Sequence, residues 1–221
     1  MLQNFKIFKN KNVFLQTIIS KKDTVLDVGF WGQGVSADEK HWPHKYLLEL
    51  ANQLDGIDLF FDEKYVQKVN PNGVYIKVEA ESFELSKKYS RIVAADLIEH
   101  LVNPGLFLDQ CAKHLEKDGV LILTTPNAFN LFNLAGKIMN YEPATNNDHT
   151  CYFNTKTITT LLDKCGWEVS QISYLYTLGP IHRESFKKKV LNVFYKLSSR
   201  VTPKYMETMV VVARPKVLLG S

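Results

Sequence analysis

The stretch Val25-Leu26-Asp27-Val28-Gly29-Phe30-Trp31-Gly32-Gln33-Gly34 joins an apolar run of strand length to a loop that contains glycines. Glycine has no Cβ atom, so such a loop can adopt positive φ angles and bring backbone N–H groups close to a ligand. The acidic residue at the end of the run, Asp27, adds a hydrogen-bond acceptor beside the loop. The stretch therefore predicts a buried strand that leads into a ligand-binding turn.

Further apolar runs of strand length follow along the chain and alternate with helical patterns. With the first run they are Thr24–Val28, Gly56–Phe61, Val74–Val78, Arg91–Ala95, Val120–Thr125, Glu168–Tyr176 and Met206–Ala213. Strands that alternate with helices predict a mostly parallel sheet covered by helices on both faces. Helices are expected from Pro43 to Leu54, from Asn103-Pro104 to Gly119, and from Asn154 to Gly166.

Size and composition favour one domain over residues 1–221. The chain has 221 residues and is 45% hydrophobic, which is enough for one large core but short for two domains and a linker. The 27 Lys and Arg residues exceed the 23 Asp and Glu residues by too little to indicate a nucleic-acid partner.

The cysteines and the N-terminal segment indicate a cytoplasmic protein. Cys111, Cys151 and Cys165 have no CxxC spacing and lie among residues expected to pack in the core. Lysines interrupt every apolar run near the N-terminus, which argues against a signal peptide or a transmembrane span.

Two acidic residues downstream of the glycine loop support the prediction of a ligand that contains a nucleoside. Asp58 stands at the next strand run, where a carboxylate can bind ribose hydroxyls, and Glu79 follows the third run, where it could accept from an adenine amino group. A pyrophosphate binder would open directly from the glycine loop into a helix, but here the next helix begins only at Pro43. This delay argues against a nicotinamide-dependent oxidoreductase.

The segment from residue 89 to residue 127 carries the most specific motifs. They are Ala95-Asp96-Leu97-Ile98-Glu99-His100-Leu101-Val102-Asn103-Pro104-Gly105 and, after a helix, Thr124-Thr125-Pro126-Asn127. With the glycine loop they resemble the class I S-adenosylmethionine-dependent methyltransferases, in particular the group that includes the ubiquinone-biosynthesis O-methyltransferases. The resemblance covers about residues 24–176, which would form the cofactor-binding core.

The resemblance implies an α/β, Rossmann-like fold and a set of cofactor contacts. The sheet would have seven strands in the order 3-2-1-4-5-7-6, with the last strand, at Met206–Ala213, antiparallel. S-adenosyl-L-methionine would contact the following residues: Asp27, Gly29, Phe30, Gly32 and Gly34 at its methionine part, Asp58 at the ribose, Glu79 and Ala80 at the adenine, and Ala95 and Asp96 at the amino end.

The glycine loop departs from the family pattern, which has a glycine at every second residue. Here Phe30 and Trp31 separate Gly29 from Gly32. The two aromatic side chains are expected either to pack against the next helix or to cover the cofactor or substrate.

Methyl transfer to a hydroxyl needs a group that takes up the proton. His100 follows the fourth strand run at the expected ligand-binding edge, and His149 lies in a loop before a helix. Together with Glu99 they are the candidate catalytic residues.

The same region also has the spacing of a metal site. Asp96, Glu99 and His100 follow a D-x-x-E-H pattern, and His149 could supply a fourth ligand for Mg²⁺, Mn²⁺ or Zn²⁺. This pattern resembles the small-RNA 3′-terminal methyltransferases, in which a glutamate replaces Asp96. The alternative is that Glu99 and His100 only cap and orient the following helix.

Residues 127–153 and 177–204 are expected to build the acceptor side of the site. Within the second segment, Arg183–Lys204 is basic and amphipathic. It would be an outer helix packed on the sheet, a substrate lid, or a peripheral membrane contact.

The predicted function is methyl transfer to a hydroxyl of a small metabolite, a sugar or a lipid-linked intermediate. An RNA-terminal 2′-O-methyltransferase with a divalent cation is the alternative enzyme, and a cofactor-binding scaffold without catalysis is the non-enzyme alternative. The sequence gives no indication of the oligomeric state.

Overall fold

The computed structural model describes residues 5–32, 42–138, 146–176 and 203–216. Its strands are β1 (Lys6–Phe8), β2 (Thr24–Val28), β3 (Gln53–Asp58), β4 (Tyr75–Lys77), β5 (Tyr89–Ala95), β6 (Leu115–Pro126), β7 (Trp167–Leu175) and β8 (Thr208–Pro215). Its α-helices are α1 (Lys11–Leu15), α2 (Pro43–Leu50), α3 (Glu63–Val69), α4 (Pro104–His114), α5 (Leu131–Ile138) and α6 (Thr155–Lys164).

All these strands form one sheet in the order β1-β7-β8-β6-β5-β2-β3-β4. β8 is antiparallel to both of its neighbours, and the other pairs are parallel. The predicted α/β class is therefore confirmed. Without β1, the strands lie in the order expected from the resemblance.

The expected number of seven strands is wrong because β1 adds an eighth strand to the sheet in the described part of the chain. This short strand pairs with β7 at one edge of the sheet. Lys6 and Ile7 are exposed and Phe8 is half-buried, so the segment shows neither the length nor the apolar pattern of a core strand.

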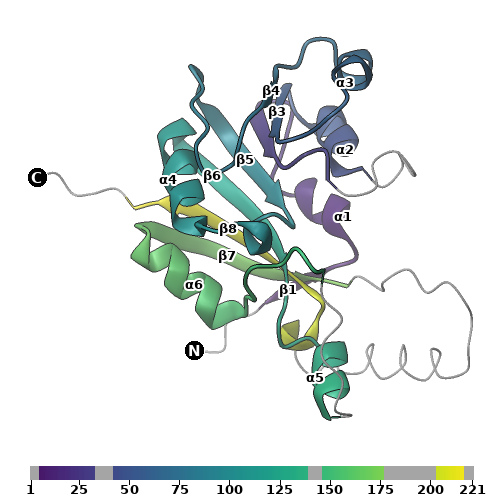
Figure 1. Ribbon diagram of the computed structural model, residues 1–221, viewed down its shortest axis with the longest axis vertical. Helices are drawn as coiled ribbons and strands as arrows, with labels where there is room; N and C mark the ends of the chain where they lie inside the picture. The colour runs from purple at the N-terminus through teal and green to yellow at the C-terminus, as the bar shows by residue number, and fades with distance from the viewer. Residues whose placement is uncertain (1–4, 33–41, 139–145, 177–202, 217–221) are drawn as a thin grey trace, which may run out of the picture.

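Helices cover both faces of the sheet (Figure 1). Alternate residues along a strand point to opposite faces. Accordingly, Leu26 of β2 packs in one core cluster with residues of α4 and α6, whereas its neighbour Val25 packs in another with residues of α1 and α2. α5 projects away from the sheet at the bottom of the view.

The two best-signalled helices begin where the sequence predicts. α6 starts with a capping box in which the Asn154 side chain accepts from the backbone of Thr157 and the Thr157 hydroxyl accepts from the backbone of Asn154. α4 starts at Pro104 but ends at His114, not at Gly119, because the chain enters β6 at Leu115.

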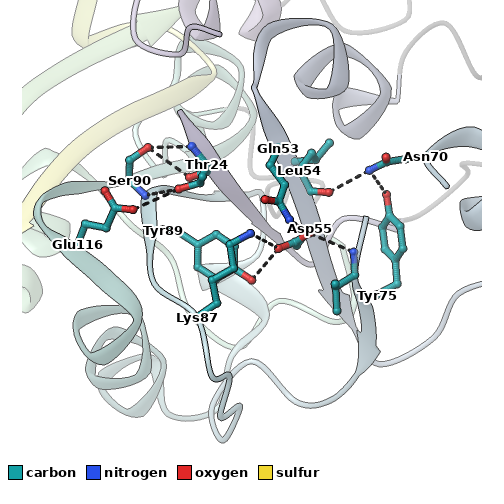
Figure 2. A network of polar contacts seen from close by, with 11 residues as sticks. Thr24, Gln53, Leu54, Asp55, Asn70, Tyr75, Lys87, Tyr89, Ser90 and Glu116 are labelled. Carbon is teal, nitrogen blue, oxygen red and sulfur yellow. Dashed lines mark hydrogen bonds and ion pairs between the residues drawn. The ribbon is translucent and has the colours of Figure 1, made fainter. Parts of the chain in front are cut away.

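β3 begins earlier than predicted, at Gln53, because its polar residues have buried partners. The Asp55 carboxylate is 1% exposed and accepts hydrogen bonds from Lys87 Nζ at 2.9 Å, the Tyr89 hydroxyl at 3.0 Å and the Val74 backbone N–H at 3.0 Å (Figure 2). A charged residue can therefore occupy the middle of a buried strand. The prediction that the strand starts at Gly56 did not anticipate these contacts of Asp55.

Some expectations fall outside the described residues. These include Gly34 and nearly all of the basic stretch Arg183–Lys204. Among the described helices, none has the length and apolar character needed to cross a membrane.

Candidate active site at the carboxyl edge of the sheet

The glycine loop after β2 has the backbone conformation of a ligand cradle. Gly29 and Gly32 have φ angles of +72° and +54°, which only glycine adopts without strain. The Gly29 N–H donates to the Ile57 carbonyl at 2.9 Å, and a Cβ atom on Gly29 would lie 2.9 Å from the Leu97 side chain. Among the described residues nothing lies within 4 Å of where a Cβ of Gly32 would be, so its backbone faces open space.

Asp58 lies at the end of β3, beside the loop. Its carboxylate accepts from the Trp31 backbone N–H at 2.9 Å and from the Phe60 backbone N–H at 3.2 Å. The same carboxylate that the resemblance assigns to the ribose thus also holds the glycine loop against the end of β3.

The Phe30 and Trp31 side chains pack in an aromatic cluster. The Phe30 ring is 4% exposed, and its centroid lies 5.2 Å from the centroids of Phe61 and Tyr75. Its carbonyl accepts from the Trp42 indole N–H at 2.6 Å. A Cβ atom on Gly56 would lie 2.7 Å from the Phe30 ring, so this glycine gives the ring its place.

Phe30 is expected among the cofactor contacts; its ring packs in this core, and its backbone belongs to the loop that the resemblance assigns to the cofactor. The packing alternative therefore describes both aromatic residues.

Asp27 is buried beneath the loop and paired with a histidine that the sequence analysis missed. Its Oδ2 lies 2.9 Å from Nδ1 of His44, a fully buried residue on α2. Burial raises the pKa of Asp27, while the contact with His44 acts in the opposite direction. His44 directly follows the helix-starting proline and has no motif spacing that would have singled it out.

Asp96 follows β5 with a φ angle of +52°, which is uncommon for a residue other than glycine. Its carboxylate accepts from the Thr124 hydroxyl at 2.7 Å and pairs with Lys11 Nζ of α1 at 2.7 Å. Desolvation acts to raise the pKa of Asp96, but Lys11 and Thr124 outweigh it and lower the pKa. Lys11 was not predicted as a site residue.

The remaining expected cofactor residues lie at the same edge. Ala95 ends β5 and is half-buried, Ala80 is half-buried, and Glu79 is exposed in the loop after β4.

Glu99 and His100 come together with His149, which lies on a distant segment of the chain. One ligand atom from each residue lies within 4.8 Å of the others, and the two histidine rings are 4.6 Å apart and nearly perpendicular. The loop that carries His149 is fixed here because the Thr150 N–H and hydroxyl both donate to the Glu99 carbonyl, at 2.8 and 3.1 Å. Asp96, which the D-x-x-E-H pattern places among the four expected ligands, is not in this group.

Glu99 is the least satisfied polar group in this cluster. It is 2% exposed, and within the described part of the chain neither of its carboxylate oxygens has a hydrogen-bond partner; the hydroxyl of Thr125 also has none. Burial and, to a smaller extent, the Asp96 charge raise the pKa of Glu99 to about 7. Burial and the neighbouring His100 lower the pKa of His149.

A cavity of about 120 Å³ adjoins this cluster. Its lining includes Glu99, His149, Cys151, Tyr152 and several asparagines of the segment after β6. Buried polar groups are normally paired, so an unpaired carboxyl beside a cavity suits a ligand that supplies the missing hydrogen bond.

The residues fit both groups that the resemblance implies. The left-handed glycines, the open space over Gly32 and the buried Asp27 suit a cofactor without a pyrophosphate. One carboxylate and two imidazoles form a donor set that divalent transition metals accept.

Comparison with known proteins identifies the family. The model of a methyltransferase domain family matches residues 5–172. The chain belongs to this family. It is a class I S-adenosylmethionine-dependent methyltransferase, as its sequence predicts, and S-adenosylmethionine is its cofactor.

Among curated proteins, the methyltransferase is 24% identical to the ubiquinone biosynthesis O-methyltransferase of Rickettsia typhi over 116 residues. The match covers 50% of the chain and 47% of that relative, so the chain spans about half the length of that protein.

Among solved structures, the methyltransferase resembles magnesium protoporphyrin IX methyltransferase from Synechocystis with bound S-adenosylhomocysteine. The TM-score is 0.58 at 14% identity, covering 93% of this chain and 80% of the other. A methyltransferase from Archaeoglobus fulgidus gives a TM-score of 0.55 at 15% identity, with 91% of each chain covered. These likenesses establish the fold.

Proposed function

We propose that this methyltransferase transfers the methyl group of S-adenosylmethionine to a hydroxyl oxygen of a small metabolite, a sugar or a lipid-linked intermediate. The observation that supports this most is the buried carboxyl of Glu99, which has no hydrogen-bond partner among the described residues and lies beside His100 and His149 next to a cavity. An N-methyltransferase has less need of such a cluster, because a neutral amine can attack the methyl group without first losing a proton.

Asp27, Gly29 and Gly32 would hold the methionine part of the cofactor, with Asp58 at the ribose and Glu79 and Ala80 at the adenine. The sulfonium of S-adenosylmethionine supplies an activated methyl group, so the protein mainly has to align the acceptor and exclude water. The half-buried Ala95 and the Lys11–Asp96 pair would border the cofactor's amino end.

The acceptor proton would pass to the Glu99–His100–His149 cluster. Glu99 has a pKa near neutrality, which suits proton uptake at physiological pH. His149 is half-buried with a lowered pKa and would stay neutral and able to accept.

A divalent cation is the second candidate for the same step. Glu99, His100 and His149 would hold it, and a bound cation lowers the pKa of a coordinated hydroxyl. The two oxygens of Glu99 without hydrogen-bond partners favour this alternative.

The decisive experiment incubates the enzyme with labelled S-adenosylmethionine and separate pools of small metabolites, lipid extract and RNA. Label in an alkali-stable ether of a small or lipid acceptor is expected. Label only in RNA ends would replace the proposal with the RNA-terminal activity, and no transfer to any pool would favour a scaffold. Activity that survives exhaustive chelation and does not respond to added Mg²⁺, Mn²⁺ or Zn²⁺ would exclude the cation.

A further inference from the structure

A chain of hydrogen bonds links Asn70, at the end of α3, to Asp27 beneath the glycine loop. Asn70 Nδ2 lies 2.9 Å from the Leu54 carbonyl and 3.0 Å from the Tyr75 hydroxyl, the Tyr75 hydroxyl lies 2.8 Å from His44 Nε2, and His44 Nδ1 lies 2.9 Å from Asp27 (Figure 2 shows the Asn70 end). His44 is 0% exposed, Asp27 3% and Asn70 5%. These contacts occupy both nitrogens of the histidine ring.

The Leu54 carbonyl fixes the direction of the two bonds that Asn70 makes, and these leave the Tyr75 proton available to His44. The Leu54 carbonyl can only accept, so the Asn70 atom beside it is the amide nitrogen, which also donates to Tyr75. The Tyr75 oxygen therefore accepts from Asn70, and its own proton is free for His44 Nε2. His44 then carries its proton on Nδ1 and donates it to Asp27.

This arrangement favours the ionised form of Asp27, against the effect of burial, which leaves the pKa of Asp27 raised overall. Burial alone raises its pKa, and the donor at His44 Nδ1 is the first contact that opposes this effect. The other charged or titratable groups that act on Asp27 are Lys11 of α1, which favours the ionised form, and Asp58, which opposes it; Tyr75 lies on the far side of His44.

We propose that His44 is a positioning residue that holds Asp27 ionised beneath the glycine loop, so that binding favours cationic S-adenosylmethionine more than it would with an uncharged acid at this position. The preference for S-adenosylmethionine is measured here as the dissociation constant of S-adenosylhomocysteine divided by that of S-adenosylmethionine. S-adenosylmethionine carries a sulfonium charge that S-adenosylhomocysteine lacks. A buried carboxylate discriminates between the two because Coulomb attraction is strong away from water. The inference rests on the role proposed above for Asp27 at the methionine end of the cofactor.

Titration calorimetry with S-adenosylmethionine and S-adenosylhomocysteine tests this by the ratio of the two dissociation constants. H44F keeps a ring in the aromatic cluster but removes the donor, whereas H44N places an amide N–H close to the former Nδ1 position. At pH 7 we expect the ratio of the two dissociation constants in H44F to shift about tenfold away from S-adenosylmethionine. H44N should retain the preference.

The pH dependence separates this role from a purely structural one. In H44F the contact that partly offsets the effect of burial on the pKa of Asp27 is lost, so the preference should return as pH rises towards 9 and Asp27 ionises. Y75F removes the donor to Nε2 and should shift the preference in the same direction, and it carries the test if H44F does not fold. A wild-type ratio at every pH in both folded variants, or in Y75F alone if H44F does not fold, overturns the role of His44.

D27N tests the underlying assumption separately. It should lose the preference at all pH values. If D27N keeps the wild-type ratio, the proposed place of Asp27 at the methionine end is wrong, whatever the His44 variants do. If D27N loses the preference but neither H44F nor Y75F does, only the inference about His44 fails.

Discussion

At the scale of single residues, the site contains one buried carboxyl group with a hydrogen-bond donor, Asp27, and one without a partner among the described residues, Glu99. Asp27 is buried with a histidine donor at 2.9 Å, whereas both oxygens of the equally buried Glu99 are without partners in the described part of the chain. A buried carboxyl without partners costs stability once it ionises. Such a cost is expected where the group has a chemical role.

Glu99→Gln should therefore stabilise the protein and inactivate it. The pKa of Glu99 is raised to about 7 in the folded state from the ordinary glutamate value of 4.5, so Glu99 lowers the stability progressively as pH rises from about 4.5 to about 7. In chelator-treated protein we expect the E99Q variant to gain up to about 3 kcal/mol over wild type at pH 8 and almost nothing at pH 4.

Denaturant unfolding at the two pH values measures this difference. Methyl transfer should fall by about 100-fold or more. Glu84→Gln, at an exposed carboxylate, is the matched control and should change neither property. Equal stability of E99Q and wild type at pH 8 would contradict the expectation.

At the scale of secondary-structure elements, the segment after β6 is fixed by asparagines. The Asn127 side chain donates to the Lys204 and Met206 carbonyls at 2.6 and 2.9 Å, and its backbone N–H donates to the Glu207 carbonyl at 2.7 Å. Asn127 thus joins the cavity wall to the start of β8. The sequence singled out this residue only as the end of a motif.

Asn127→Ala should loosen this wall without disturbing the cofactor loop. We expect the KM for the acceptor to rise about tenfold, because the three side-chain hydrogen bonds of Asn127, of about 1 kcal/mol each, are lost near the cavity. The dissociation constant for S-adenosylhomocysteine should change less than twofold. Steady-state kinetics and calorimetry measure these constants, with Asn147→Ala, at an exposed loop residue, as the control.

The elements that sequence could predict are those with a repeating local signal. The bounds of β2 and the start of α6 agree with the prediction because an apolar run of strand length and apolar residues at helical spacing are visible in the sequence. β1 and the start of β3 were missed because they depend on partners far along the chain, Tyr174 of β7 and Lys87 before β5. The pairing of His44 with Asp27 was missed for the same reason.

At the scale of the whole molecule, ligand binding should stabilise the single sheet as a unit. S-adenosylhomocysteine at 100 times its dissociation constant adds about 2.7 kcal/mol to the free energy of unfolding. For a chain of this size we expect the melting temperature to rise by about 5–10 °C. A thermal-shift titration measures it, and NAD at the same concentration should have no effect. Stabilisation by NAD instead would contradict the cofactor assignment.

The position of β8 between β6 and β7 has a consequence for synthesis of the protein in the cell. β8 comprises residues 208–215, yet it pairs with β6 over Leu121–Pro126 on one side and with β7 on the other. Until these residues leave the ribosome, β6 has an open edge, and β7 and β1 have no link to the rest of the sheet. The nascent chain therefore exposes the apolar edge of β6 until β8 has been synthesised, and a chaperone would protect this edge during that interval.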